Sequence, residues 1–129
     1  MEKTFNVDII TPDKKFLSVD SLEVVVPSYD GLITILRDHI PIITFLRPGV
    51  LKIKIESNYE DFFIQEGTVE FFSNKLLILT SSIIKKTDLN KDEIEKMLKK
   101  VDRELEETNL TDKQSYILSH KRDVLKEIN

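Results

Sequence analysis

The sequence predicts an N-terminal antiparallel β-sandwich followed by a C-terminal antiparallel two-helix hairpin. All three glycines and all four prolines lie before residue 88, among short apolar runs that turn signals separate. Residues 1–87 hold 10 basic and 12 acidic groups, whereas the much shorter remainder holds 9 and 11. That remainder also carries apolar residues at helical spacing. We therefore divide the 129-residue chain into domains at 1–87 and 88–129.

The strands of the first domain follow from alternation and from turn residues. Phe5, Val7 and Ile9 alternate with polar residues, as a half-buried strand does. The run from Ile42 to Leu46 fits either a strand or a loop. Asn58 to Asp61 is interpreted as a polar hairpin connection. The expected strands cover residues 5–9, 16–18, 22–26, 50–55, 62–65, 69–72 and 76–80.

The second domain is predicted to be two amphipathic helices joined by a short link. The first begins after Asn90, an N-cap candidate with Glu93 three residues later, and the second after Thr111, with Gln114 in the same relation. Both pairs have the spacing of a capping box. Each helix has one narrow apolar stripe, so the hairpin should lie against the β domain or a partner. The stripes contain Ile94, Met97, Leu98, Val101 and Leu105, then Ile117, Leu118, Val124, Leu125 and Ile128.

Composition and motifs exclude several classes of protein. A net charge of −4 argues against nucleic-acid binding through a basic surface, and the absence of cysteine excludes disulfides and thiolate chemistry. No phosphate-binding glycine loop, metal-ligand spacing or nucleophile motif occurs, so we expect no catalytic residues, no metal and no cofactor. The first residues lack a signal peptide's apolar segment, and no apolar run approaches the ~20 residues that span a bilayer. We expect a soluble protein.

The stretch from Gly31 to Gly49 is the most informative part of the chain. It crowds isoleucine, leucine and phenylalanine between turn-forming residues. Its ordinary interpretation is a core strand, a tight turn and a second strand. Its functional interpretation is an exposed apolar edge for a partner, formed by Tyr29, Leu32, Ile40 and Ile42.

An ordered set of residues along the whole chain matches one family pattern. The matching residues are Val7 to Asp13, Val24 to Pro27, Gly31, Ile35, Leu36, His39, Pro41, Pro48, Gly49, Leu51, Ile53, Gly67 to Val69 and Leu76 to Leu79, with the hairpin following Asp88 and Leu89. In this order and spacing the chain resembles the epsilon subunit of the F-type ATP synthase, whose mitochondrial homologue is called delta.

The resemblance implies a non-catalytic subunit of the rotor. Its sandwich would bind the gamma subunit and the c-ring, and would couple ring rotation to the catalytic head. In many family members the hairpin can leave the sandwich, reach the alpha and beta subunits of the head and block ATP hydrolysis. The expected location is the cytoplasmic face of the bacterial inner membrane, peripheral within the complex, or the organelle equivalent.

The resemblance also assigns residues to these roles. The gamma and c-ring contacts it implies are Tyr29, Gly31, Leu32, Arg37, Asp38, His39, Ile40, Pro41 and Ile42. A regulatory role in the helices falls to Arg103, Lys121, Arg122 and Lys126. Family members that bind ATP carry a motif with Asp, Arg and Ala where this chain has Asn90, Glu93 and Ile94. An acid in place of the arginine repels phosphate, so we expect no ATP binding at micromolar concentrations.

A second interpretation needs no ATP synthase. The chain would then be a free-standing β-sandwich that binds a peptide or small ligand beneath a helical lid. Binding to gamma favours the rotor subunit, whereas a stable monomer with a closed ligand pocket favours the free-standing module.

Overall fold

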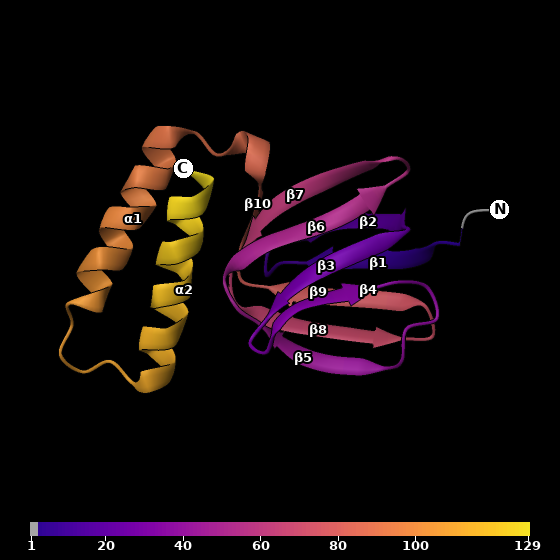
Figure 1. Cartoon of the computed structure of the whole chain (residues 1–129), viewed down its shortest axis with the longest axis horizontal. Helices are drawn as coiled ribbons and strands as arrows, with labels where there is room; N and C mark the ends of the chain where they lie inside the picture. The colour runs from indigo at the N-terminus through magenta and orange to yellow at the C-terminus, as the bar shows by residue number, and fades with distance from the viewer. Residues whose placement is uncertain (1–2) are drawn as a thin grey trace.

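Ten strands, a short 3₁₀ helix and two α-helices make up residues 3–129, which the computed structural model describes (Figure 1). The elements are β1 (Phe5–Ile10), β2 (Lys15–Ser21), β3 (Glu23–Ser28), β4 (Gly31–Ile35), β5 (Ile42–Leu46), β6 (Gly49–Ile55), β7 (Asn58–Ile64), β8 (Gly67–Phe72), β9 (Lys75–Thr80), β10 (Ile83–Lys85), η1 (Lys86–Asp88), α1 (Lys91–Leu105) and α2 (Asp112–Ile128). The predicted order of a β-sandwich followed by a helical hairpin is confirmed.

The strands form one curled sheet whose two halves face each other. Their order is β10-β7-β6-β3-β5-β8-β9-β1-β2, with β4 paired to β3. The halves join where Ser28 of β3 pairs with Leu46 of β5. All pairings are antiparallel except that of β1 with β9, which is parallel. The run from Ile42 to Leu46, which the sequence left open, is a strand.

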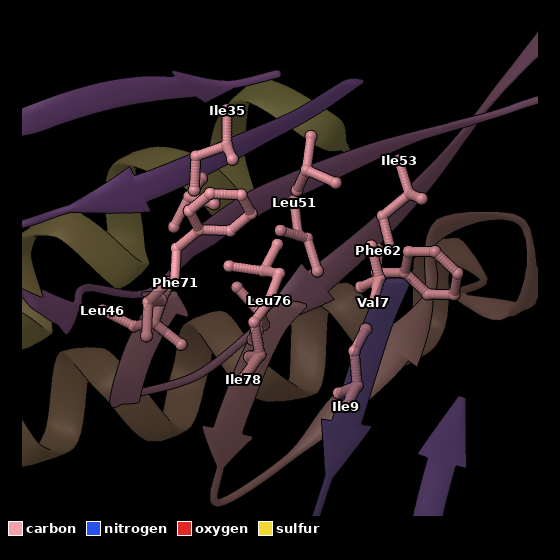
Figure 2. Close-up of a cluster of buried hydrophobic side chains, with 14 of the residues drawn as sticks. Val7, Ile9, Ile35, Leu46, Leu51, Ile53, Phe62, Phe71, Leu76 and Ile78 are labelled. Carbon is pink, nitrogen blue, oxygen red and sulfur yellow. The ribbon is translucent and has the colours of Figure 1, made fainter. Parts of the chain in front are cut away.

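The core lies between the two halves of the sheet (Figure 2). Alternate residues of the strands point inward, so each strand contributes side chains two positions apart. Figure 2 shows side chains from β1, β6, β7, β8 and β9 converging on one cluster. Its fully buried members include Val7, Ile9, Leu51, Ile53, Leu76 and Ile78.

At two positions the backbone conformation or the available space requires a glycine. Gly31 has a φ of +120°, a conformation that side chains with a Cβ rarely adopt, and it starts β4 directly after the turn. Gly67 begins β8, and a Cβ there would lie 1.9 Å from the Leu79 carbonyl oxygen. The close approach of β8 to β9 therefore requires Gly67.

The helical hairpin begins where the capping residues predicted. The Asn90 side chain accepts a hydrogen bond from the Glu93 backbone N–H at 2.8 Å, and Thr111 forms a complete capping box with Gln114. The first box is only half formed, because the Glu93 carboxylate accepts from the Asn90 side-chain amide instead of its backbone N–H. Arg122 of α2 lies 3.1 Å from Asp102 of α1 and joins the two helices.

The hairpin packs on the outside of the sandwich through a second hydrophobic cluster. Phe63 of β7 points away from the main core, since its neighbours Phe62 and Ile64 point into it. Phe63 is nevertheless buried, because Ile94, Val101 and Leu125 of the helices pack around it. The apolar stripes of the hairpin are thus used for docking on the sandwich.

One expected connection is wrong. Asn58 to Asp61 is the first half of β7, and the chain turns at Glu56 and Ser57 instead. Tyr59 of this segment pairs with Lys54 across the strands, and its hydroxyl donates a hydrogen bond to the Glu23 carboxylate. The Asp61 carboxylate lies 3.5 Å from the Lys52 ammonium. The polar side chains that make these contacts on β7 gave the segment a composition typical of a loop, which is why the sequence predicted a connection there.

Candidate functional site

Large apolar side chains lie exposed on the outer side of β5, β8 and β9. Ile43 is 80% exposed, Phe72 62%, Phe45 59% and Leu79 41%. The strand register brings them together: Phe45 and Leu79 flank Thr68, and Ile43 lies opposite Glu70 next to Phe72. We call Ile43, Phe45, Phe72 and Leu79 the outer apolar face. Grouped apolar side chains on a surface are typical of sites that bind a protein, a membrane or a ligand, so this face is a candidate contact surface.

The loop from Leu36 to Pro41 extends this face at one end of the sandwich. Leu36 is 52% exposed and Ile40 73%. Pro41 lines a shallow pocket together with Ile43 and Phe72. The predicted contact residues Arg37, Asp38, Ile40 and Pro41 are all exposed there, so the structure places part of the expected site beside the outer apolar face.

His39 is held by the loop and the core. Its Nδ1 lies 2.7 Å from the Ile40 carbonyl oxygen, and its ring meets Phe71 edge-on with centroids 5.9 Å apart. A carbonyl only accepts, so Nδ1 carries the proton and Nε2 is left as a hydrogen-bond acceptor. Backbone, not the neighbouring Asp38, satisfies the first nitrogen.

The turn from Tyr29 to Leu32 lies at the opposite end of β4 from this loop. The Tyr116 hydroxyl of α2 donates a hydrogen bond to the Tyr29 carbonyl at 3.0 Å, and the two rings pack edge-on at 5.6 Å. Burial raises the pKa of the Tyr29 phenol, and Glu66 raises it further. In the docked arrangement, α2 therefore covers part of this turn, which the sequence predicted as a gamma or c-ring contact.

The single apolar edge expected from Tyr29, Leu32, Ile40 and Ile42 is not formed. Tyr29 packs against α2, and Ile42 points toward the core as a half-buried residue. Leu32 is 67% exposed but lies on β4, at the far end of that strand from Ile40. The alternation of β5 explains the difference, because Ile43 and Phe45 face outward while Ile42 and Leu46 face inward.

Sequence reasoning missed the outer apolar face, although a signal was present. A strand with one solvated face alternates apolar and polar residues, whereas a strand covered on both faces is apolar at nearly every position. β5 is IITFL, and β9 contains the run LLIL. The core covers only one side of each strand, so the apolar residues of the other side are left exposed on the outer apolar face.

The four basic residues assigned to regulation do not form a phosphate site. Arg122 pairs with Asp102, and Arg103 and Lys126 are exposed. Burial lowers the pKa of the half-buried Lys121 ammonium, and Glu104 and Glu66 partly offset that effect. The pocket beside Lys121 is also lined by three carboxylates, Glu66, Glu104 and Glu107. These carboxylates repel an anionic ligand.

Residues 3–129 contain no group of three or more His, Asp or Glu side chains placed to hold a metal ion. Over the same residues, neither helix is long and apolar enough to cross a membrane.

Two comparisons with known proteins identify the family. Residues 4–86 match the family of the ATP synthase delta/epsilon chain, beta-sandwich domain. The ATP synthase epsilon chain of Pelagibacter ubique (strain HTCC1062) is 41% identical over 130 residues, covering 100% of both chains.

Two solved structures share the fold. A chain in the Euglena gracilis mitochondrial ATP synthase has a TM-score of 0.75 at 12% identity, covering 98% of this chain and 79% of that chain. A chain in the central stalk and c-ring of the Tetrahymena thermophila mitochondrial ATP synthase has a TM-score of 0.67 at 18% identity, covering 95% and 93%. The full-length sequence match and the family match over the sandwich show that this chain belongs to the ATP synthase delta/epsilon family, as a non-catalytic epsilon subunit.

Proposed function

We propose that this subunit binds gamma through the outer apolar face and the adjoining loop, and so couples c-ring rotation to gamma and the catalytic head. The uncovered outer apolar face carries the proposal, because water-exposed Ile43, Phe45 and Phe72 gain free energy when a partner covers them. The Tyr29–Leu32 turn, at the other end of β4, is the part we assign to the c-ring. The structural relative from Tetrahymena thermophila comes from a central stalk and c-ring assembly, which supports this assignment.

Coupling needs a rigid body, and the sandwich has the properties of one. Inward-pointing residues of nearly every strand fill one continuous core, and such cores are close-packed. Torque applied at the c-ring turn would then reach the gamma contacts without being lost in internal motion. No bond is made or broken by this subunit, and its contribution to synthesis is mechanical.

We assign the hairpin a regulatory role. It docks through the cluster around Phe63, the Tyr116 contact to Tyr29 and the Lys113 ammonium, which lies 6.0 Å from the centroid of the Phe45 ring, all outside the main core. Elements docked through few contacts open at lower free energy than the core does. An undocked hairpin could extend along gamma to the alpha and beta subunits and inhibit ATP hydrolysis.

The alternative function, a free-standing binding module with a helical lid, is set aside because the family is now established.

Phe72→Glu tests the gamma contact. Phe72 lies opposite Lys75, so a glutamate there gains an oppositely charged neighbour and should leave the fold intact. At an apolar interface the same charge is desolvated, and we expect gamma affinity to fall at least tenfold. The matched control is Thr34→Glu, an exposed strand position of the other half of the sheet. Equal gamma affinity for both variants would contradict the proposed surface.

A further inference from the structure

The side chain of Asn74 connects two segments that are 36 residues apart. It lies in the β8–β9 turn, where Ser73 and Asn74 both have positive φ values of 48° and 60°. A two-residue hairpin turn of this handedness suits the twist of antiparallel strands, and asparagine tolerates the conformation. The turn therefore forms without help from the Asn74 side chain, which is free to reach across to the loop between β4 and β5.

A reciprocal pair of hydrogen bonds joins this turn to the loop. The Asp38 backbone N–H donates to Asn74 Oδ1 at 2.7 Å, and Asn74 Nδ2 donates to Asp38 Oδ1 at 2.9 Å. The Asn74 carbonyl also accepts from the backbone N–H of Asn6 at 3.1 Å. Arg37 adds a hydrogen bond from its guanidinium to the Thr4 carbonyl at 3.2 Å. Three segments of the chain thus meet at this end of the sandwich.

The loop has few side-chain contacts that hold Asp38 in place. Asp38 has a φ of 68°, a left-handed conformation that aspartate, like asparagine, adopts more readily than most residues do. The neighbours Leu36 and Ile40 are exposed and supply no core packing to hold it. Both side-chain hydrogen bonds of Asn74 go to Asp38, so they fix the residue between the exposed Leu36 and Ile40.

We infer that Asn74 is a positioning residue for partner binding, which holds Asp38 so that the loop presents Leu36 and Ile40 beside the outer apolar face. The inference rests on the proposed binding of gamma to that surface. Loop ordering on association costs free energy, and a loop already ordered in the free protein avoids that cost. The role is one of preorganisation, and Asn74 itself need not touch gamma.

Asn74→Gly separates this role from the fold. Glycine adopts positive φ readily, so the turn is kept while both side-chain hydrogen bonds are lost. In the free full-length chain, hydrogen exchange of the Asp38 amide should accelerate about five- to tenfold, as loss of one hydrogen bond predicts. Affinity for the gamma subunit of the same organism should fall by about the same factor. Ser73→Gly is the control, because it changes the same turn without touching the Asp38 contact, and it should alter neither quantity.

Two results would overturn the inference. One is unchanged Asp38 exchange in Asn74→Gly, and the other is faster exchange with unchanged gamma affinity. A wild-type chain that fails to bind gamma would instead overturn the proposed function, and this role with it, while the exchange measurement would still report on the hydrogen bonds. The two failures are therefore told apart by the wild-type titration.

Discussion

His39 has one ring nitrogen occupied by the loop and one available to a partner. Its Nδ1 is bound to the Ile40 carbonyl, which leaves Nε2 as an acceptor at the edge of the proposed gamma surface. His39→Ala should weaken gamma binding by about 1 kcal/mol, the typical net value of a hydrogen bond. Titration calorimetry measures the affinity, and a melting curve checks that the fold is kept. Unchanged affinity would leave His39 with only its structural contacts to Ile40 and Phe71.

We expect His120 to make hairpin docking depend on pH. It lies on α2 against Tyr116, with ring centroids 4.4 Å apart. Burial lowers the pKa of His120 below its ordinary 6.5, the Arg47 guanidinium of the sandwich lowers it further, and Asp123 offsets part of the effect. The docked hairpin therefore binds a proton less readily than the undocked one. Docking is strongest above pH 6.5 and weakens as the pH falls below it.

A distance reporter can follow this dependence. The chain has no cysteine, so introduced cysteines at Ser57 and Ser119 can carry a pair of dyes without interference. We expect the undocked fraction to rise between pH 7.5 and pH 5.5, across the ordinary histidine pKa. His120→Gln keeps a polar side chain but cannot titrate, so its undocked fraction should stay level. A dependence that persists in His120→Gln would assign it to another group.

At the scale of elements, the hairpin lacks what ATP binding requires. Glu93 lies in the first turn of α1, and its carboxylate accepts a hydrogen bond from the Asn90 side-chain amide. A negative charge at this end of the helix is stabilised by the helix dipole, and it repels a phosphate group. Arg122 is engaged by Asp102, and carboxylates surround Lys121. Titration of the isolated protein with Mg-ATP should give a dissociation constant no tighter than millimolar, which corresponds to a binding free energy of roughly 4 kcal/mol. A micromolar constant would show that the remaining cations suffice.

The helices were the elements that the sequence predicted best. Their signals are local, because a cap and the residue three positions later, or an apolar stripe at helical spacing, depend only on near neighbours. Thr111 and Gln114 interact as their spacing indicated. The Asn90 box closed differently, since a side-chain amide competes with the backbone N–H for the Glu93 carboxylate.

The pairing of strands that are distant in the sequence could not be predicted from local residue patterns. The parallel pairing of β1 with β9 joins residues some 70 positions apart, and no local signal specifies it. The hydrogen bond between Asn74 and Asp38 also joins residues far apart in the sequence, so no local pattern predicts it. The loop around His39 stays a predicted contact, and it lies beside the outer apolar face. The sequence did not indicate that face, because the two faces of β5 and β9 were not assigned separately.

The whole molecule combines a rigid sandwich with an element docked on its outside. The sandwich has its own continuous core, and the hairpin contributes to a separate cluster around Phe63. We therefore expect the two domains, 1–87 and 88–129, to divide the work of assembly and regulation. Removing the hairpin uncovers Phe63 and Ile84, so the shortened chain should carry Phe63→Ser to stay soluble.

Binding of gamma by the full chain and by residues 1–87 carrying Phe63→Ser tests the central claim most directly. Both are titrated with the same gamma preparation, after circular dichroism has shown that the shortened chain is folded. We predict 1:1 complexes with dissociation constants that agree within about threefold, or about 0.65 kcal/mol as RT ln 3. The shortened chain keeps the loop and the whole outer apolar face, and it loses there only the contact of Lys113 with the Phe45 ring. A folded sandwich that fails to bind gamma while the full chain binds would contradict the account.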